Sequence, residues 1–253
     1  MRTRDGDTAL AVSDRVAIVA ALEREVRPLI KNWHSSRRQY EGRAFKFFES
    51  EWAVLVCGGI GAEAARRASE AVIAIYHPSL IISAGLAGAL DPTLLVGSVL
   101  TPRWVIDAGD GSRTDTGAGV GALISIDSVA GPGQKAKLAK AYDAQAVDME
   151  AAAVARGAQA RGVRFVAIKA ISDESNFVMP PMKQFVNGNG EFNTSRFVVF
   201  ALVRPWLWLK MVQLARNASR AARALCESLE QRSRTGGNGE TLGLKLLVSQ
   251  GQQ

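Results

Sequence analysis

The chain has 253 residues, of which 47% are hydrophobic and 22% charged, and this balance excludes a disordered or fibrous protein. The length suits one substantial hydrophobic core, so we expect a single domain over residues 15–232 between flexible tails at 1–14 and 233–253. The formal net charge is +7, and residues 196–234 hold eight Lys or Arg against two Glu. This concentration predicts one local basic face and argues against a general nucleic-acid-binding protein.

Two cysteines, Cys57 and Cys226, lie alone in apolar stretches, which predicts neither a disulfide nor a cysteine-based metal site. A reducing compartment fits this usage, and no metal or other cofactor is expected. Residues 1–15 contain acidic side chains and no sustained apolar run, so we expect no signal peptide. The longest apolar stretches are interrupted by charged residues and prolines, so a cytoplasmic protein without a membrane-spanning helix is expected.

Along the chain, short apolar runs alternate with segments of helical spacing. The predicted strands cover 16–22, 45–49, 52–59, 80–90, 122–130, 144–150 and 165–173. The predicted helices cover 23–33, 62–76, 134–142, 151–162 and 205–232, and residues 107–121 read as a glycine-rich surface loop. This alternation predicts an α/β fold of three layers, with a central mostly parallel or mixed sheet flanked by helices. Ligands are then expected outside the carboxyl ends of the strands, and the segment 83–88 is one strand end of interest.

Two acidic residues follow buried strands at such ends. Glu150 stands between the strand AVD and the helical AAAVA, and Asp173 ends FVAIKAISD. A carboxylate at a helix N-terminus is favoured by the helix dipole, but an ordinary helix cap occupies the same position. Position alone therefore leaves capping and catalysis both open.

Five segments, in order, resemble the superfamily of nucleoside phosphorylases and methylthioadenosine/S-adenosylhomocysteine nucleosidases. They are VAIVAALEREV, CGGIGAEAA, IISAGLAGALDPTLLVGSVL, AVDMEAAAVA and VAIKAISDESN, spanning about residues 15–176. The pair AVDME and AISD is the specific part, whereas glycine loops such as GGIG are weak evidence by themselves.

The resemblance implies cleavage of the N-glycosidic bond of a purine nucleoside. Asp173 matches the acid that protonates N7 of the departing adenine, and Glu150 the carboxylate that binds the ribose hydroxyls. Glu25 matches the glutamate that activates water in the hydrolytic branch. The resemblance further places Met149 against the sugar, Val129 and Ala130 against the base, and the segment with Gly85 and Leu86 beside the substrate.

The chain departs from the family pattern at the phosphate site. Where phosphorylases carry an arginine and a Ser or Thr, this sequence has Ser83 and Leu86, so phosphate is only a possible co-substrate and hydrolysis against phosphorolysis stays open. Arg103, Arg113 or Lys169 would have to supply the charge, and for each a solvated surface position is the simpler interpretation. The segment 97–121 is also shorter than in the usual nucleosidases, which implies an open 5′ side.

The predicted C-terminal helix has an apolar stripe and a basic one. Met211, Leu214, Leu225 and Leu229 lie near the first, together with Leu207 and Ala218, and Arg216, Arg220, Arg223 and Glu227 lie on the second. A helix packed on the sheet is one interpretation. The other is peripheral contact with the inner membrane surface, because Trp206 and Trp208 accompany the arginines.

The chain further resembles one branch of this superfamily, the hopanoid-associated phosphorylases, through the SAGLAGALDP segment, AVDME, the MPP after ISDESN, and LARNASRAARAL. That resemblance implies a lipid-linked 5′-substituted adenosine, adenosylhopane, as substrate. The alternatives are a methylthioadenosine/S-adenosylhomocysteine nucleosidase and a non-catalytic nucleoside-binding or membrane-peripheral protein. Family members are commonly oligomeric, so a homo-oligomer is expected.

Overall fold

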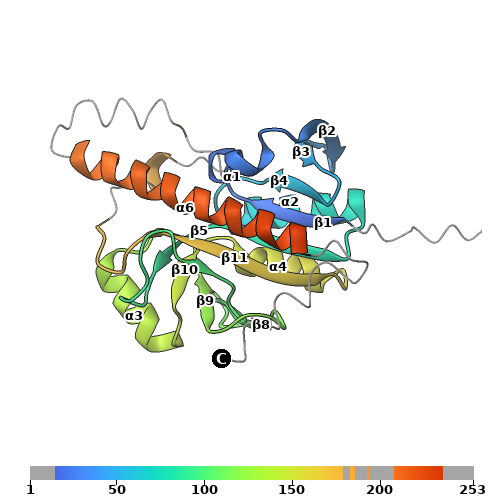
Figure 1. The fold of residues 1–253 in the computed structure, drawn as a ribbon. Helices are drawn as coiled ribbons and strands as arrows, with labels where there is room; N and C mark the ends of the chain where they lie inside the picture. The colour runs from blue at the N-terminus through green and yellow to red at the C-terminus, as the bar shows by residue number, and fades with distance from the viewer. Residues whose placement is uncertain (1–14, 179–182, 186–192, 194–207, 236–253) are drawn as a thin grey trace, which may run out of the picture.

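The computed structural model describes residues 15–178, 183–185, 193 and 208–235 as one three-layer α/β structure (Figure 1). Its sheet has eleven strands. The main path runs β2-β3-β4-β1-β5-β10-β9-β7-β8, and β11 pairs with β5 and with β6. The strands are β1 Val16–Ala20, β2 His34–Tyr40, β3 Arg43–Glu49, β4 Ala53–Cys57, β5 Leu80–Ala89, β6 Val99–Leu100, β7 Trp104–Asp107, β8 Arg113–Asp115, β9 Ala122–Ser125, β10 Ala146–Asp148 and β11 Arg164–Asp173. The predicted fold class is confirmed.

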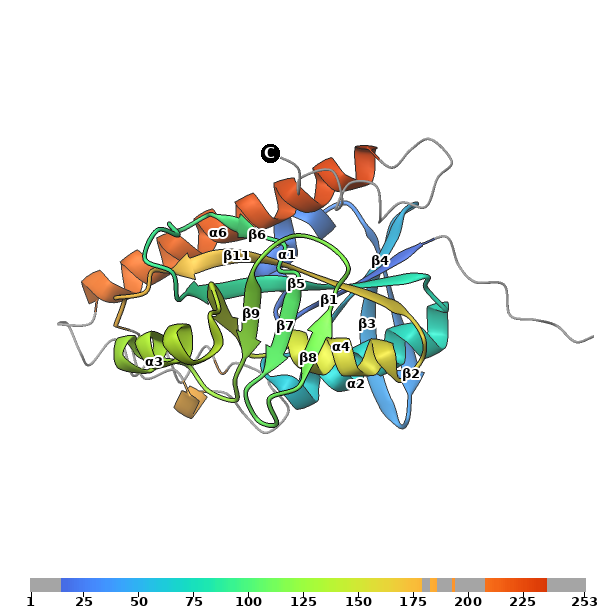
Figure 2. The ribbon, with the colours of Figure 1, turned by 90° about the horizontal axis from the view of Figure 1, so that it is seen from below.

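The helices cover both faces of this sheet (Figures 1 and 2). They are α1 Glu23–Ile30, α2 Ala62–Tyr76, α3 Pro132–Tyr142, α4 Ala151–Gln159 and α6 Trp208–Thr235, with a short 3-10 turn at Lys183–Phe185. Helices α2 and α4 pack side by side on one face, and α1 and α6 on the other. No described helix is long and apolar enough to cross a membrane.

Side-chain alternation along β1 explains why its sequence is continuously apolar. Ala17 and Val19 belong to the core beneath α2 and α4, whereas Val16, Ile18 and Ala20 belong to the core beneath α1 and α6. A strand covered on both faces has no solvent side, so every position is apolar. The short buried strand runs in the sequence are therefore a consequence of the three-layer arrangement.

In the centre of the sheet, β5 pairs with strands of both directions. It runs parallel to β1 and β11 but antiparallel to β10, which pairs with its last residues, Gly88 and Ala89. The segment 83–88, predicted as a strand end, forms the carboxyl part of β5, which ends at Ala89, and β11 pairs with that strand from Leu80 through Gly88.

Other parts of the sheet differ from the expectation. The segment 107–121 contains β8, which pairs antiparallel with β7, so it is not all loop. The strand β2 was not predicted, because HSSRRQY has no apolar run; it is an exposed edge strand joined to β3 by a tight turn at Glu41 and Gly42, both with positive φ.

The C-terminal helix was predicted over 205–232, and the structure continues it to Thr235, so residues 233–235, which were assigned to the C-terminal tail, are helical. Its predicted stripes are borne out where they are described: Leu225 and Leu229 are buried, and the basic stripe from Arg216 to Arg223 is exposed. Residues 205–207, with Trp206 and Leu207, and the MPP motif at 179–181 lie outside the described residues. The domain limits themselves remain predictions.

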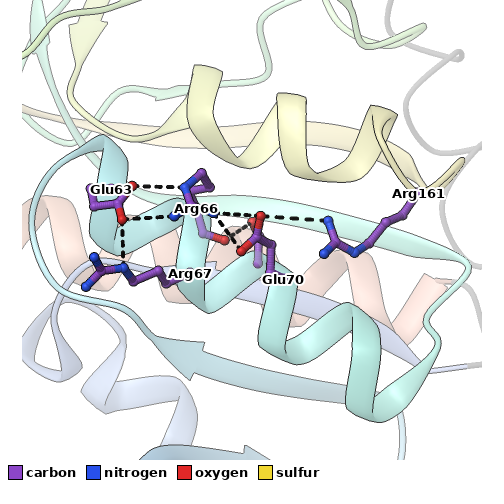
Figure 3. Close-up of polar contacts among 6 residues, drawn as sticks. Glu63, Arg66, Arg67, Glu70 and Arg161 are labelled. Atoms are coloured by element: carbon purple, nitrogen blue, oxygen red, sulfur yellow. Dashed lines mark hydrogen bonds and ion pairs between the residues drawn. The ribbon is translucent and has the colours of Figure 1, made fainter. Parts of the chain in front are cut away.

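Helices α2 and α4 pack closely, and an ion pair links them at the protein surface (Figure 3). A Cβ on Gly157 of α4 would lie 2.6 Å from Ser69 Oγ of α2, so glycine permits the contact. Across it, Arg161 lies 3.9 Å from Glu70, which Arg66 also pairs with. Exposed pairs of this kind each contribute little, so apolar packing is the main source of stability here.

Candidate active site

A cavity of about 500 Å³ opens at the carboxyl edge of the sheet. It is lined by the segments that follow β1, β4, β9 and β10, by the ends of β5 and β11, and by Leu214 and Ala218 of α6. Carboxyl ends of parallel strands meet at one edge, so residues distant in sequence converge there.

The cavity brings together seven of the eight predicted site residues: Glu25, Leu86, Val129, Ala130, Met149, Glu150 and Asp173. Gly85 is not among its lining residues. It lies one residue back on β5, where a Cβ would be 3.4 Å from Lys169 Nζ and 3.7 Å from Glu25 Oε2. The structure thus gives Gly85 a packing position behind the carboxylate, and the roles of all eight residues remain predictions.

Glu25 lies in the first turn of α1, directly after β1, and is buried. Burial, reinforced by the nearby charge of Glu150, raises the pKa of the Glu25 carboxyl to about 7. Its Oε2 atom accepts no hydrogen bond within the described part of the chain, and the buried Ser83 hydroxyl on β5 is equally unpartnered there. Such unsatisfied buried groups are costly, and a bound water or substrate atom would satisfy them.

Glu150 occupies the N-cap position of α4, but its side chain makes no capping hydrogen bond. Its Oε1 atom accepts instead from the backbone N–H of Gly61 at 2.9 Å, across the cavity edge. Asp148 does the capping, because its Oδ2 accepts from the N–H of Ala151 at 2.9 Å. The simple capping interpretation of Glu150 is therefore wrong. Burial, and the charge of Asp148 beside it, raise the pKa of Glu150.

Lys169 lies on β11 and is 1% exposed, which corrects the expectation of a solvated side chain. Its Nζ is 2.8 Å from Asp148 Oδ2. The other carboxyl oxygen of Asp148, Oδ1, accepts a hydrogen bond from the Ser125 hydroxyl at 2.5 Å. Burial lowers the pKa of Lys169, but the charges of Asp148 and Glu150 outweigh that effect and raise it. This lysine is the buried counter-charge of the carboxylates on one side of the cavity. Arg103 and Arg113 are exposed, as expected.

Asp173 ends β11 on another part of the cavity wall and is 3% exposed. Ser172 donates from its hydroxyl to Asp173 Oδ1 at 2.7 Å, and the Nζ of Lys135 forms an ion pair with Oδ2. Both carboxyl oxygens of Asp173 therefore contact donors, and the residue also lines the cavity.

Sequence reasoning missed Lys135, and it passed over Asp148 and Ser125 as functional partners. The sequence signal for Lys135 is weak, since it is one of three lysines in a polar helix. Asp148 adjoins the motif that was recognised, but only the structure shows its contacts with Lys169 and Ala151. Within the described residues, no group of three or more His, Cys, Asp or Glu is arranged to hold a metal ion.

Comparisons with solved structures find the same fold. Futalosine hydrolase of Helicobacter pylori is 18% identical with a TM-score of 0.61, over 86% of this chain and 98% of that one. The 5′-methylthioadenosine/S-adenosylhomocysteine nucleosidase of Neisseria meningitidis, in complex with methylthio-immucillin-A, is 20% identical with a TM-score of 0.61, over 86% and 97%. That of Colwellia psychrerythraea, in complex with adenine, is 19% identical with a TM-score of 0.63, over 86% and 93%.

By sequence, a search of curated proteins found no significant match. The family model of the phosphorylase superfamily, however, matches residues 15–134 and 120–187, which together make up more than half of the chain and include Glu25, Glu150 and Asp173. The chain belongs to the phosphorylase superfamily.

Proposed function

We propose that the protein cleaves the N-glycosidic bond of an adenine nucleoside. The observation that supports this best is the convergence of Glu25, Glu150 and Asp173, from three separate segments, on one cavity of nucleoside size. The solved structures of similar fold include nucleosidases in complex with adenine and with a nucleoside analogue.

The proposed roles follow from the chemistry of the bond. Departing adenine accumulates negative charge and needs a proton at N7, which Asp173 delivers. The ribose becomes positively charged, and Glu150 binds its hydroxyls and stabilises that charge. Met149 forms an apolar wall for the sugar, and Val129 and Ala130 contact the base.

Hydrolysis fits the cavity better than phosphorolysis. Glu25 has a pKa of about 7 and an oxygen without a protein partner, which suits a base that takes a proton from water. A phosphate dianion in that place would meet the charges of Glu25 and Glu150, and the nearest buried cation, Lys169, is already paired with Asp148.

For the substrate we propose a 5′-substituted adenosine with a large apolar group, adenosylhopane. The cavity wall includes Leu214 and Ala218 of α6, and beyond them the same helix exposes Leu209 (85%) and Val212 (51%). Methylthioadenosine and S-adenosylhomocysteine are the alternative substrates, since nucleosidases for them share the fold.

The test is release of adenine from a panel of 5′-substituted adenosines, including adenosylhopane, with and without phosphate. Release without phosphate supports the nucleosidase, and release that requires phosphate would replace it with a phosphorylase. Asp173→Asn should lower turnover by orders of magnitude with binding largely retained, because an amide has no proton to give in this way. If the wild-type protein binds nucleosides but releases no adenine, the proposal fails and a nucleoside-binding protein is the answer.

We also propose that the start of α6 contacts an anionic membrane surface. Its exposed Trp208, Leu209 and Val212 lie on the same helix as the exposed Arg216 and Arg220. Leu209→Ser with Val212→Ser should abolish sedimentation with phosphatidylcholine/phosphatidylglycerol vesicles and leave turnover of a soluble substrate unchanged. Unchanged sedimentation would refute the contact. The homo-oligomer stays a prediction that sedimentation velocity can check.

A further inference from the structure

The helix α3 buries one residue, and that residue is a lysine. Its other side chains are exposed or half-buried, whereas Lys135 is 2% exposed. Burying a lysine costs free energy unless its charge is paired, and exposed positions for lysine are plentiful on this helix. The burial of Lys135 therefore needs an explanation in what its ammonium group contacts.

The Nζ of Lys135 forms an ion pair with Asp173 Oδ2 and donates to the carbonyl oxygen of Glu174 at 2.8 Å. Both contacts are at the end of β11, next to which α3 lies (Figure 2). The backbone leaves room for them, because a Cβ on Gly88 would lie 2.9 Å from Asp173 Oδ2 and 3.1 Å from Lys135 Nζ. Lysine and aspartate also share the cavity wall.

This arrangement bears on how the proposed acid can work. The hydroxyl of Ser172 donates to Oδ1 of Asp173, and the ammonium of Lys135 to Oδ2. A carboxylate that accepts from donors on both oxygens has no proton of its own to deliver to a leaving base. Among the described residues, the ammonium group in direct contact with Asp173 is that of Lys135.

We propose that Lys135 is a positioning residue that orients Asp173 and supplies the proton that Asp173 passes to N7 of the departing adenine; this rests on the proposed function. As the C1′–N9 bond breaks, its electron pair goes to the base. One proton moves from Lys135 Nζ to the Asp173 carboxyl, and the carboxyl gives one to N7. Asp173 ends as it began, Lys135 becomes a neutral amine, and neutral adenine leaves. Lys135 regains a proton from solvent before the next turnover.

Other charged groups share the cavity with this pair and contribute to any pH profile. They are Arg24 and Glu25 from α1, Asp127 after β9, Asp148 at the end of β10, and Glu150 at the N-cap of α4. The test therefore compares variants with wild type at each pH instead of relying on one profile.

The decisive experiment uses two ribosides with different leaving groups. Adenosine, or the best adenosine derivative of the panel above, needs a proton on its base, whereas 4-nitrophenyl riboside releases a stable anion without one. Lys135→Gln should lower kcat for the adenosine substrate by roughly 10²- to 10⁴-fold, the usual range for a general acid, and change kcat for the nitrophenyl riboside by less than about threefold. Lys137→Gln, an exposed lysine of the same helix, is the matched control and should change neither.

Lys135→Arg separates the proton from the charge. A guanidinium retains the positive charge and the hydrogen bonds but does not give up its proton in proteins. Lys135→Arg should therefore lower kcat for the adenosine substrate as much as Lys135→Gln does.

Three results would overturn the inference: equal loss on both substrates, full activity of Lys135→Gln on the adenosine substrate, or recovery in Lys135→Arg. Equal loss on both substrates would mean that Lys135 has a structural role. Recovery in Lys135→Arg would mean that the reaction needs the charge of this residue and not its proton. Circular dichroism of each variant identifies a folding failure, and Lys135→Arg and Lys135→Gln provide independent chances of a folded protein. Absence of any cleavage by the wild type would instead refute the proposed function.

Discussion

Replacing Glu25 by glutamine should stabilise the protein while abolishing hydrolysis. Burial raises the pKa of this carboxyl from 4.5 to about 7. A group with a raised pKa in the folded state holds its proton there at pH values where the unfolded chain has already lost it. Stability is therefore lost as the pH rises from about 4.5 to 7, and above that window the folded protein carries the full cost of a buried charge.

The size of the effect follows from that shift. A displacement of about 2.5 pKa units, at about 1.36 kcal/mol each, corresponds to roughly 3 kcal/mol of destabilisation at pH 8 and almost none at pH 4.5. Glutamine has nearly the same shape and no charge to bury. The free energy of unfolding of Glu25→Gln should thus exceed that of wild type by up to about 3 kcal/mol at pH 8, and the difference should vanish near pH 4.5.

Urea denaturation at the two pH values measures this directly. Glu23→Gln is the matched control, because Glu23 lies two residues earlier on α1 and is exposed, paired with Lys46. Its effect should stay within about 0.5 kcal/mol at both pH values. If Glu25→Gln is no more stable than wild type at pH 8, the Glu25 carboxylate is not held in an unfavourable environment. Its pKa would then not be raised toward 7, and Glu25 would not be suited to act as the base.

Three further expectations concern the same framework. The kcat/KM for nucleoside cleavage should rise about tenfold per pH unit below pH 7 and level off above it, since the base must be deprotonated; a profile without that limb would remove Glu25 from the role. Lys169→Met should move the limb to higher pH, because Lys169 lowers the pKa of Glu25, and a limb that stays in place would contradict that coupling. Gly58→Ala should cost about 1–3 kcal/mol in thermal or urea unfolding, because its Cβ would lie 2.7 Å from the backbone oxygen of Ala64, whereas Gly133→Ala meets nothing within 4 Å and serves as control.

The parts of the fold that could be predicted from the sequence are those that depend on local pattern. Val16–Ala20 and Leu80–Ala89 are apolar without interruption because both faces of each strand are covered, and such runs are conspicuous. The edge strand His34–Tyr40 has no such cover and no such pattern, so nothing local distinguishes it from a loop. It exists because the Glu41–Gly42 turn brings it back onto β3.

The candidate site divides in the same way. Glu25, Glu150 and Asp173 stand at predictable positions, where strands give way to helices or loops, and a motif resemblance singled them out. The positions of their counter-charges, Lys135 and Lys169, could not be predicted in this way. A lysine on a polar helix and a lysine within an apolar strand both read as solvated side chains, and only the packing of α3 and β11 around the cavity removes them from water.

The two lysines pair with different carboxylates of the cavity, Lys169 with Asp148 and Lys135 with Asp173. The charges of Arg24 and, to a smaller extent, Lys169 lower the pKa of Glu25 without cancelling the effect of burial, and the pKa of that carboxyl stays near 7, where a base can both take and release a proton. Lys135 contacts Asp173 directly. A proton taken from water and a proton given to the base are the two transfers that hydrolysis of a nucleoside requires. We propose that Glu25, whose Oε2 atom has no partner within the described residues, makes the first transfer, and that Asp173, with a cation in direct contact, makes the second.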